Sequence, residues 1–340
     1  MNVDRLYLQD PVSAGVILSY KCSSTCDHCM YACAPSWRAD WFSEEGLELV
    51  LRKLAPKIQA SPYGPDSVSI NHGLHFTGGE PFLNFELLVS AVKLARGFGI
   101  PSIFVETNCF WCVEDSDAAK KLMRLKDAGL NGILISVNPF ILEQVPFERT
   151  ERAVRVSRDI FGENAMIYQE LYYRQFRGLG IRGTLTLDQY LERGGSALRY
   201  AELLPMGRAC YRLEHLFAKH PAEDFFGESC ASELTRNWHV HVDNYFNYVT
   251  GYCGGISMCD ARDLDALHQG VDLDERPIVR ALVKDIEDLY ALAVREFDYR
   301  ERERGYISKC HLCIDIRRHI AQRTDRFKEL QPRELYYHLE

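Results

Sequence analysis

Three cysteines near the start of the 340-residue chain could together hold one metal centre: Cys22, Cys26 and Cys29. They follow an apolar run at residues 15–20 that predicts a strand, so they lie on the loop after it. An ordinary iron–sulfur cluster takes four cysteine thiolates. A cluster held by only three leaves one iron open to another ligand, and that open iron predicts chemistry at this loop.

The composition of the chain helps to decide what its grouped cysteines do. The chain has twelve cysteines, a net charge of −8 and no apolar run near the ~18 residues of a membrane span. An acidic chain is not expected to be a general nucleic-acid binder, and no membrane partner is expected either. The N-terminus lacks a charged-then-apolar signal pattern, so we expect a cytoplasmic protein. In that compartment, grouped cysteines indicate metal binding or catalysis more often than disulfides.

Strand and helix signals alternate along the first two thirds of the chain, which is typical of a parallel α/β fold. Ser43 is a predicted N-cap of one helix, and Gly129 is predicted to end another that spans 115–128. The almost wholly apolar strand at 133–137 indicates a sheet buried on both faces. We expect about six β–α units, forming a partial (β/α)6 TIM-like barrel over residues 1–209. Its site would lie at the C-terminal strand ends.

The pattern changes near residue 210, and we expect a small C-terminal subdomain over 210–340. Residues 239–249 predict a hairpin that turns around 244–247, and 277–299 predict one long amphipathic helix. Four cysteines of this part have spacings that suit a second metal site: Cys253, Cys259, Cys310 and Cys313. Paired thiolates of this kind suit zinc as well as an iron–sulfur cluster.

A second motif, Gly78-Gly79-Glu80, follows the second predicted strand. Two glycines let a backbone approach a ligand closely, and the carboxylate of Glu80 can accept from an ammonium group. This motif and the Cys-x3-Cys-x2-Cys spacing together resemble those of the radical S-adenosylmethionine (SAM) superfamily. The resemblance covers roughly residues 12–208. It implies a 4Fe–4S cluster whose open iron is chelated by the amine and carboxylate of SAM, with Glu80 on the amine.

The resemblance also implies an activity. One-electron reduction of the cluster, by a reductant such as ferredoxin or flavodoxin, would cleave SAM to methionine and a 5′-deoxyadenosyl radical that abstracts a hydrogen atom from the substrate. Further contacts to SAM are implied at polar strand ends and at two other positions: His28, Glu106, Asn108, Ser136, Asn138 and Met206. His28 replaces an often aromatic residue of the family, and its flat ring can still stack near adenine.

The C-terminal cysteines carry a second resemblance. A hairpin closed by a cysteine, at residues 243–253, resembles the C-terminal extensions, SPASM or the shorter twitch, that hold auxiliary iron–sulfur clusters in peptide-modifying radical enzymes. It implies an auxiliary 4Fe–4S cluster, for which Cys230 competes with Cys259 for the last place. Four ligands would close the cluster and suit electron transfer, whereas three would leave an iron for substrate.

We therefore expect a radical SAM enzyme with an auxiliary cluster that modifies a peptide or protein side chain. A small-molecule substrate is the alternative within that class. A non-catalytic iron–sulfur electron carrier is another alternative, with Cys33 as a fourth ligand of the first cluster, and a zinc-stabilised binding module is a third. Cys109 and Cys112 lie near the expected SAM site, where packing is a more common role for free cysteine than redox chemistry.

Overall fold

The computed structural model describes residues 4–38, 40–200 and 202–340, which form two compact units. The sheet unit comprises 12–26 and 33–203. The C-terminal unit comprises 204–340 together with two N-terminal segments, 4–11 and 27–32. The division therefore falls six residues before the boundary expected after residue 209, and two N-terminal segments belong to the C-terminal unit. Within the described residues, no helix is both long and apolar enough to cross a bilayer.

The sheet unit contains a parallel sheet in the order β6-β5-β4-β3-β2. Its strands are β2 (Ser13–Ile17), β3 (Gly73–Thr77), β4 (Ile103–Thr107), β5 (Gly132–Ser136) and β6 (Ala165–Tyr168). Every residue of β2 and β3 is buried, as expected for strands covered on both faces. The expected parallel α/β architecture is confirmed. Because the strands are parallel, their carboxyl ends meet at one edge, where a site can form.

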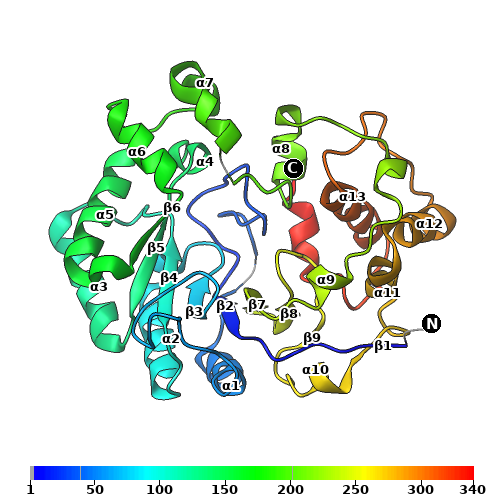
Figure 1. The fold of residues 1–340 in the computed structure, drawn as a ribbon, viewed down its shortest axis with the longest axis horizontal. Coiled ribbons are helices and arrows are strands. Elements are labelled where there is room, and N and C mark those ends of the chain that lie inside the picture. The colour runs from blue at the N-terminus through cyan, green and yellow to red at the C-terminus, as the bar shows by residue number, and fades with distance from the viewer. Residues whose placement is uncertain (1–3, 39, 201) are drawn as a thin grey trace. The chain divides into compact units, whose positions relative to one another are not determined.

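Helices cover the strands of the sheet unit (Figure 1). The longer ones are α1 (Glu44–Leu54), α2 (Phe85–Gly97), α3 (Asp115–Ala128) and α5 (Phe147–Phe161). Shorter helical segments are α4 (Pro139–Leu142), α6 (Glu170–Gly178), α7 (Leu187–Gly194), η1 (Pro81–Asn84), η2 (Gly162–Asn164) and η3 (Gly195–Tyr200). The Ser43 hydroxyl caps α1 by accepting from the Gly46 N–H, and Gly129 ends α3 with φ +113°. Both local predictions are confirmed.

Five parallel strands, rather than six, are present among the described residues of the sheet unit. After β6 the chain passes from α6 to α7 through residues 179–186, which form no strand. Gly180 and Gly183 there have φ values of +62° and +66°, in the left-handed region that interrupts extended backbone. The sixth β–α unit of the expected barrel is thus replaced by helices and a turn.

The C-terminal unit contains the expected hairpin. Strand β7 (Val240–Asp243) pairs antiparallel with β8 (Asn247–Val249), which pairs with β9 (Cys259–Asp260). The Asp243 carboxylate closes the turn by accepting from the backbone N–H groups of Tyr245 and Asn247, at 3.0 and 2.9 Å. A second small sheet joins β1 (Arg5–Leu6) to β10 (Val271–Asp272).

The long helix expected at 277–299 is two helices, α11 (Pro277–Lys284) and α12 (Ile286–Phe297). Asp285 between them is extended, and its carboxylate accepts from the N–H groups of Glu287 (2.8 Å) and Gly227 (3.0 Å). Helix α13 (Lys309–Ala321) begins after Ser308, whose hydroxyl caps it. The remaining helical segments are α8 (Ala209–Arg212), α9 (Ala231–Leu234), α10 (Ala266–Gln269), η4 (Glu214–Leu216), η5 (Ala222–Phe225) and η6 (Arg333–Tyr337).

Candidate functional site

The buried carboxylate of Glu80 lies just past the carboxyl end of β3. Among the described residues, three groups donate to it: the Thr107 hydroxyl (2.9 Å), the Asn108 N–H (2.8 Å) and the Phe82 N–H (3.2 Å). Burial raises the pKa of this carboxyl to about 7, although the three donors oppose the rise. A carboxylate offers about four acceptor positions. Glu80 therefore retains the capacity to accept from one further donor, such as an ammonium group.

The two glycines before Glu80 adjoin the start of the cysteine loop. A Cβ at Gly79 would lie 1.8 Å from the Lys21 carbonyl oxygen, and the Glu80 N–H donates to that same oxygen at 3.0 Å. Gly78 has φ +122°, and a Cβ there would lie 2.5 Å from the Ser19 carbonyl oxygen. The glycines are thus required by the chain's own backbone, which brings Glu80 beside the residue that precedes Cys22.

Asn108 connects the end of β4 to the same loop. Its amide nitrogen lies 3.0 Å from the Ser23 hydroxyl, 3.3 Å from the Ser24 hydroxyl and 3.7 Å from the Cys22 Sγ. A donor beside a thiolate favours the charged form that binds metal. The structure therefore places this predicted SAM contact against the first cysteine.

The other predicted contacts at the strand ends are placed differently. Glu106, in β4, accepts from the Thr77 hydroxyl at 2.6 Å, and burial raises the pKa of its carboxyl to about 7. Ser136 is the last residue of β5 and is half-buried. The Asn138 side chain caps α4 by accepting from the Ile141 N–H at 3.0 Å. The Asn138 side chain therefore has a structural role at the start of α4, and its contact to SAM stays a prediction.

The segment with His28 and Cys29 belongs to the C-terminal unit, where Arg208 holds it. The Arg208 side chain donates to the Ala32 carbonyl at 2.7 Å, and its backbone N–H donates to the Cys29 carbonyl at 3.0 Å. Burial, and secondarily the charge of Arg208, lowers the pKa of His28 to about 4. The imidazole is therefore neutral at physiological pH, which suits the stacking role predicted for it.

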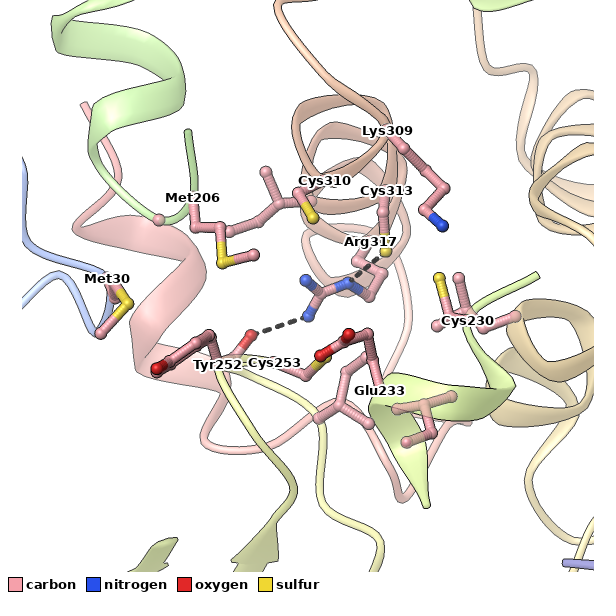
Figure 2. A pocket seen from close by; sticks show the side chains of 16 residues that line it. Met30, Met206, Cys230, Glu233, Tyr252, Cys253, Lys309, Cys310, Cys313 and Arg317 are labelled. Atoms are coloured by element: carbon pink, nitrogen blue, oxygen red, sulfur yellow. Dashed lines mark hydrogen bonds between the residues drawn. The ribbon is translucent and has the colours of Figure 1, made fainter. Parts of the chain in front are cut away.

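A cavity in the C-terminal unit is lined by four cysteines, two from one helix and two from other segments (Figure 2). They are Cys230, Cys253, Cys310 and Cys313. The cavity volume is about 60 Å³. On the same measure, a cavity needs only ~10–15 Å³ to hold one water. Cys310 and Cys313 lie in the first turn and a half of α13, Cys253 follows β8, and Cys230 precedes α9.

Cys259, one of the four predicted ligands, does not line this cavity, whereas its competitor Cys230 does. Cys259 lies in β9, paired with Tyr248 of β8, and the pairing fixes it in the sheet. The Cys230 backbone N–H donates to the Leu282 carbonyl at 2.8 Å, which fixes that cysteine next to α11. We therefore revise the fourth member of the set from Cys259 to Cys230.

Met206 also lines the cavity, as does Met30. The contact of Met206 to SAM stays a prediction. A Cβ at Gly207 would lie 2.2 Å from the Met30 carbonyl oxygen. Gly207 has φ +56°, so the close approach and the backbone conformation both favour glycine there. The 205–208 turn therefore packs against the residue that follows Cys29.

The cavity thiols influence one another. Burial, followed by the charge of Cys313, raises the pKa of Cys230 to about 11. Burial, followed by the charges of Cys313 and Cys230, raises the pKa of Cys310 to about 12. Without a cation, ionisation of one thiol thus opposes ionisation of the next. A bound metal reverses this balance, because thiolates rather than thiols are its ligands.

The remaining cysteines pack. Cys33 is buried, and its thiol donates to the Gly78 carbonyl at 3.3 Å, which favours packing over the role of fourth ligand. Burial raises the pKa of Cys112 to about 12 and that of Cys109 well above its usual value. The Cys210 thiol donates to the Pro205 carbonyl at 3.1 Å.

Two further residues contact the predicted site residues. Thr107 donates to Glu80, and Arg317 donates through Nε to the Cys313 Sγ at 3.3 Å. The spacing of Cys313 and Arg317, four residues apart on a helix, was a usable signal because such residues share a helix face. No comparable local signal marks Thr107, whose partner lies 27 residues away.

No protein-family model matches the chain. Its fold has some similarity, over most of its length, to those of several solved structures. BtrN, in complex with AdoMet and 2-DOIA, is 12% identical with a TM-score of 0.45, over 81% of this chain and 88% of that chain. For anSMEcpe with bound AdoMet the identity is 13% and the TM-score 0.46, over 90% and 95%. For Streptococcus suis SuiB bound to S-adenosylmethionine, the identity is 11% and the TM-score 0.30, over 95% of this chain and 77% of that chain.

Proposed function

We propose that this chain is a radical SAM enzyme whose SAM-binding 4Fe–4S cluster is held by Cys22, Cys26 and Cys29. The environment of Glu80 is the observation that carries the proposal. A buried carboxylate with one acceptor position to spare lies beside the start of the cysteine loop. Such a group suits an ammonium ion, and the cysteine spacing suits a cluster with an open iron.

The chain's own residues would bind and orient SAM. The chemistry that the bound cluster and SAM supply is one-electron reductive cleavage of SAM to a 5′-deoxyadenosyl radical. Glu80 would accept from the SAM ammonium, which would lower the pKa of its carboxyl from about 7. Asn108 would donate to the Cys22 thiolate from 3.7 Å. The burial of both residues keeps water away from these contacts.

We propose a second 4Fe–4S cluster in the cavity of the C-terminal unit, with Cys230, Cys253, Cys310 and Cys313 as its ligands. Four cysteines converge there, and the lining also carries the cationic side chains of Arg317 and Lys309. Cations suit a cluster that four thiolates make anionic overall. Because four ligands leave no iron open, this cluster suits electron transfer rather than substrate binding.

A peptide or protein side chain is the proposed substrate class, and a ferredoxin or flavodoxin the proposed reductant. The substrate class rests on the hairpin closed by Cys253, which resembles the C-terminal extensions of peptide-modifying radical enzymes. Strands β7 and β8 and the turn at Asp243 form that hairpin.

The enzyme class can be tested with the anaerobically reconstituted protein. Addition of SAM should alter the EPR signal of the reduced cluster, and dithionite should then release 5′-deoxyadenosine. Cys26→Ala should abolish that release, whereas Cys33→Ala, a change of the same kind seven residues away, should preserve it. Loss of cluster and activity in Cys33→Ala, with no effect of SAM on the wild-type signal, would instead favour an electron carrier with four cysteine ligands.

The substrate class needs a separate experiment. An extract of the source organism would be divided by ultrafiltration into macromolecular and small-molecule fractions, and each would be added to the reduced enzyme with SAM. Stimulated 5′-deoxyadenosine release by the macromolecular fraction, abolished by prior protease treatment, is the expected result. Stimulation by the small-molecule fraction alone, insensitive to protease, would replace the peptide substrate with a small molecule.

A further inference from the structure

The cavity with the four cysteines contains a buried guanidinium that contacts one of them. Arg317 donates from Nε to the Cys313 Sγ at 3.3 Å, and the two residues are one helical turn apart in α13. The residue is 4% exposed, so its charge is almost fully removed from water. A charge-assisted hydrogen bond in such surroundings is stronger than the same contact at the surface.

Arg317 also joins segments that are distant in the chain. Its Nη1 donates to the Gly254 carbonyl and to the Tyr336 hydroxyl, each at 2.9 Å. The Tyr336 hydroxyl in turn donates to the Gly255 carbonyl at 2.6 Å. Gly254 follows Cys253 directly, so one side chain links the segment of Cys253 to the helix of Cys313. Figure 2 shows the Arg317 guanidinium with its hydrogen bonds to Cys313 and to the segment that follows Cys253.

We propose that Arg317 is a positioning residue that sets the spacing of Cys253 and Cys313 and raises the reduction potential of the auxiliary cluster. This inference rests on the second cluster proposed above. A four-thiolate 4Fe–4S cluster carries one more negative charge when reduced than when oxidised. A nearby buried cation therefore stabilises the reduced form more, and hydrogen bonds to the cysteine sulfurs act in the same direction.

Arg317 is better placed for this role than the other charged groups near the cavity. Lys309 also lines it, but its ammonium donates to the Ser229 carbonyl at 3.0 Å and pairs with Glu228 at 3.2 Å. Glu233 lines it as an opposing negative charge. Arg318, the next residue of α13, pairs with Glu340 and does not line the cavity. It therefore provides a matched control for the loss of one arginine charge from the same helix.

The potential would be measured on the full chain carrying Cys22→Ala, Cys26→Ala and Cys29→Ala, so that any iron–sulfur signal belongs to the auxiliary cluster. Arg317→Met, Arg317→Lys and Arg318→Met would be compared by EPR-monitored redox titration. Arg317→Met should make reduction at least tenfold less favourable, which is a fall of about 59 mV in midpoint potential. Arg318→Met should change it by less than a third of that. Arg317→Lys should give an intermediate value, because it keeps the charge and loses the planar donor pair.

Three outcomes would overturn the proposal in distinguishable ways. A parent protein that binds no iron–sulfur cluster after reconstitution would remove the second cluster, and this inference with it. A cluster whose potential is the same in Arg317→Met as in the parent would overturn the role of Arg317 alone. If Arg317→Met fails to retain the cluster, Arg317→Lys decides the matter, and a potential and EPR spectrum equal to those of the parent would overturn the proposal.

Discussion

The Glu80 carboxyl illustrates how one residue serves both the fold and the proposed chemistry. It accepts from Thr107, Asn108 and Phe82, so it ties the segment after β3 to the end of β4. Its burial nevertheless opposes ionisation more strongly than these donors favour it, and the pKa is about 7. In the absence of a cationic ligand, the ionised carboxylate is therefore a source of instability at neutral and alkaline pH.

This balance predicts the pH dependence of stability in the ligand-free protein. The unfolded carboxyl loses its proton near pH 4.5 and the folded one near pH 7, so the folded state binds more protons between these values. The stability contribution of Glu80 is then fully present below pH 4.5 and is lost as pH rises through 7. The loss is of the order of 3 kcal/mol, at about 1.4 kcal/mol per pKa unit. Urea unfolding at pH 5 and pH 8 would measure it.

Replacement of Glu80 separates its own contribution to the pH dependence of stability from the contributions of other titrating groups. Glu80→Gln should unfold at similar free energies at pH 5 and pH 8, apart from the background change shared with all variants. Glu86→Gln is a suitable control, because Arg124 lowers the pKa of that exposed carboxyl and keeps it ionised across this range. If Glu80→Gln and wild type lose the same free energy between the two pH values, the raised pKa of Glu80 is contradicted.

At the scale of elements, the end signals of two helices were confirmed, whereas a break inside a predicted helix was missed. Ser43 caps α1 and Gly129 ends α3 through contacts within one turn. The break at Asp285 went unpredicted, because one of the two N–H groups from which its carboxylate accepts belongs to Gly227, 58 residues away. The sequence also leaves Cys230 and Cys259 as alternatives for the fourth cavity cysteine, because only the pairing of β8 with β9 shows that Cys259 lies in the sheet.

The close contact between Gly79 and the cysteine loop predicts that a side chain at Gly79 would disturb both segments. Gly79→Ala should be strongly destabilising, by about 3 kcal/mol, because its Cβ would overlap the Lys21 carbonyl oxygen at 1.8 Å. The loss of iron from the first cluster should accompany it, since the Lys21 backbone adjoins Cys22. Thermal unfolding and iron analysis of the reconstituted protein would measure both effects.

Gly97→Ala offers the same substitution at a site without a clash. Gly97 is the last residue of α2, and a Cβ there would meet no atom within 4 Å. Its effect should lie within about 1 kcal/mol of wild type, in the stabilising direction expected of alanine in a helix. Similar unfolding free energies for Gly79→Ala and Gly97→Ala would show that the cysteine loop can move away from Gly79 without cost.

At the scale of the whole molecule, the sequence marks the cysteine groups but not the way the chain assembles them. The spacings of Cys22, Cys26 and Cys29 and of Cys310 and Cys313 are local, so they are visible in the sequence. The cavity instead collects cysteines separated by up to 83 positions, from Cys230 to Cys313. Their meeting depends on the hairpin, on α11 and on α13 together, which no short pattern encodes.

That assembly predicts different results for two substitutions that look equivalent in the sequence. Cys230→Ala should remove a ligand from the cavity and lose the iron of the auxiliary cluster, about half of the total if two 4Fe–4S clusters are bound. Cys259→Ala should retain all of it, because Cys259 lies in β9 outside the cavity. Iron and sulfide analysis after anaerobic reconstitution would compare the two, and recovery of zinc with no iron in the cavity would replace the cluster with a structural zinc site.

The same pair of variants separates the auxiliary cluster from the first one. Cys230→Ala leaves the 22–29 loop and Glu80 unchanged, so it should still cleave SAM without coupling to substrate, whereas turnover of substrate should be lost. Cys259→Ala should retain both reactions. The opposite pattern, with full turnover in Cys230→Ala and loss of iron in Cys259→Ala, would place the fourth ligand in β9. It would also require β9 to detach from β8, because their pairing holds Cys259 opposite Tyr248.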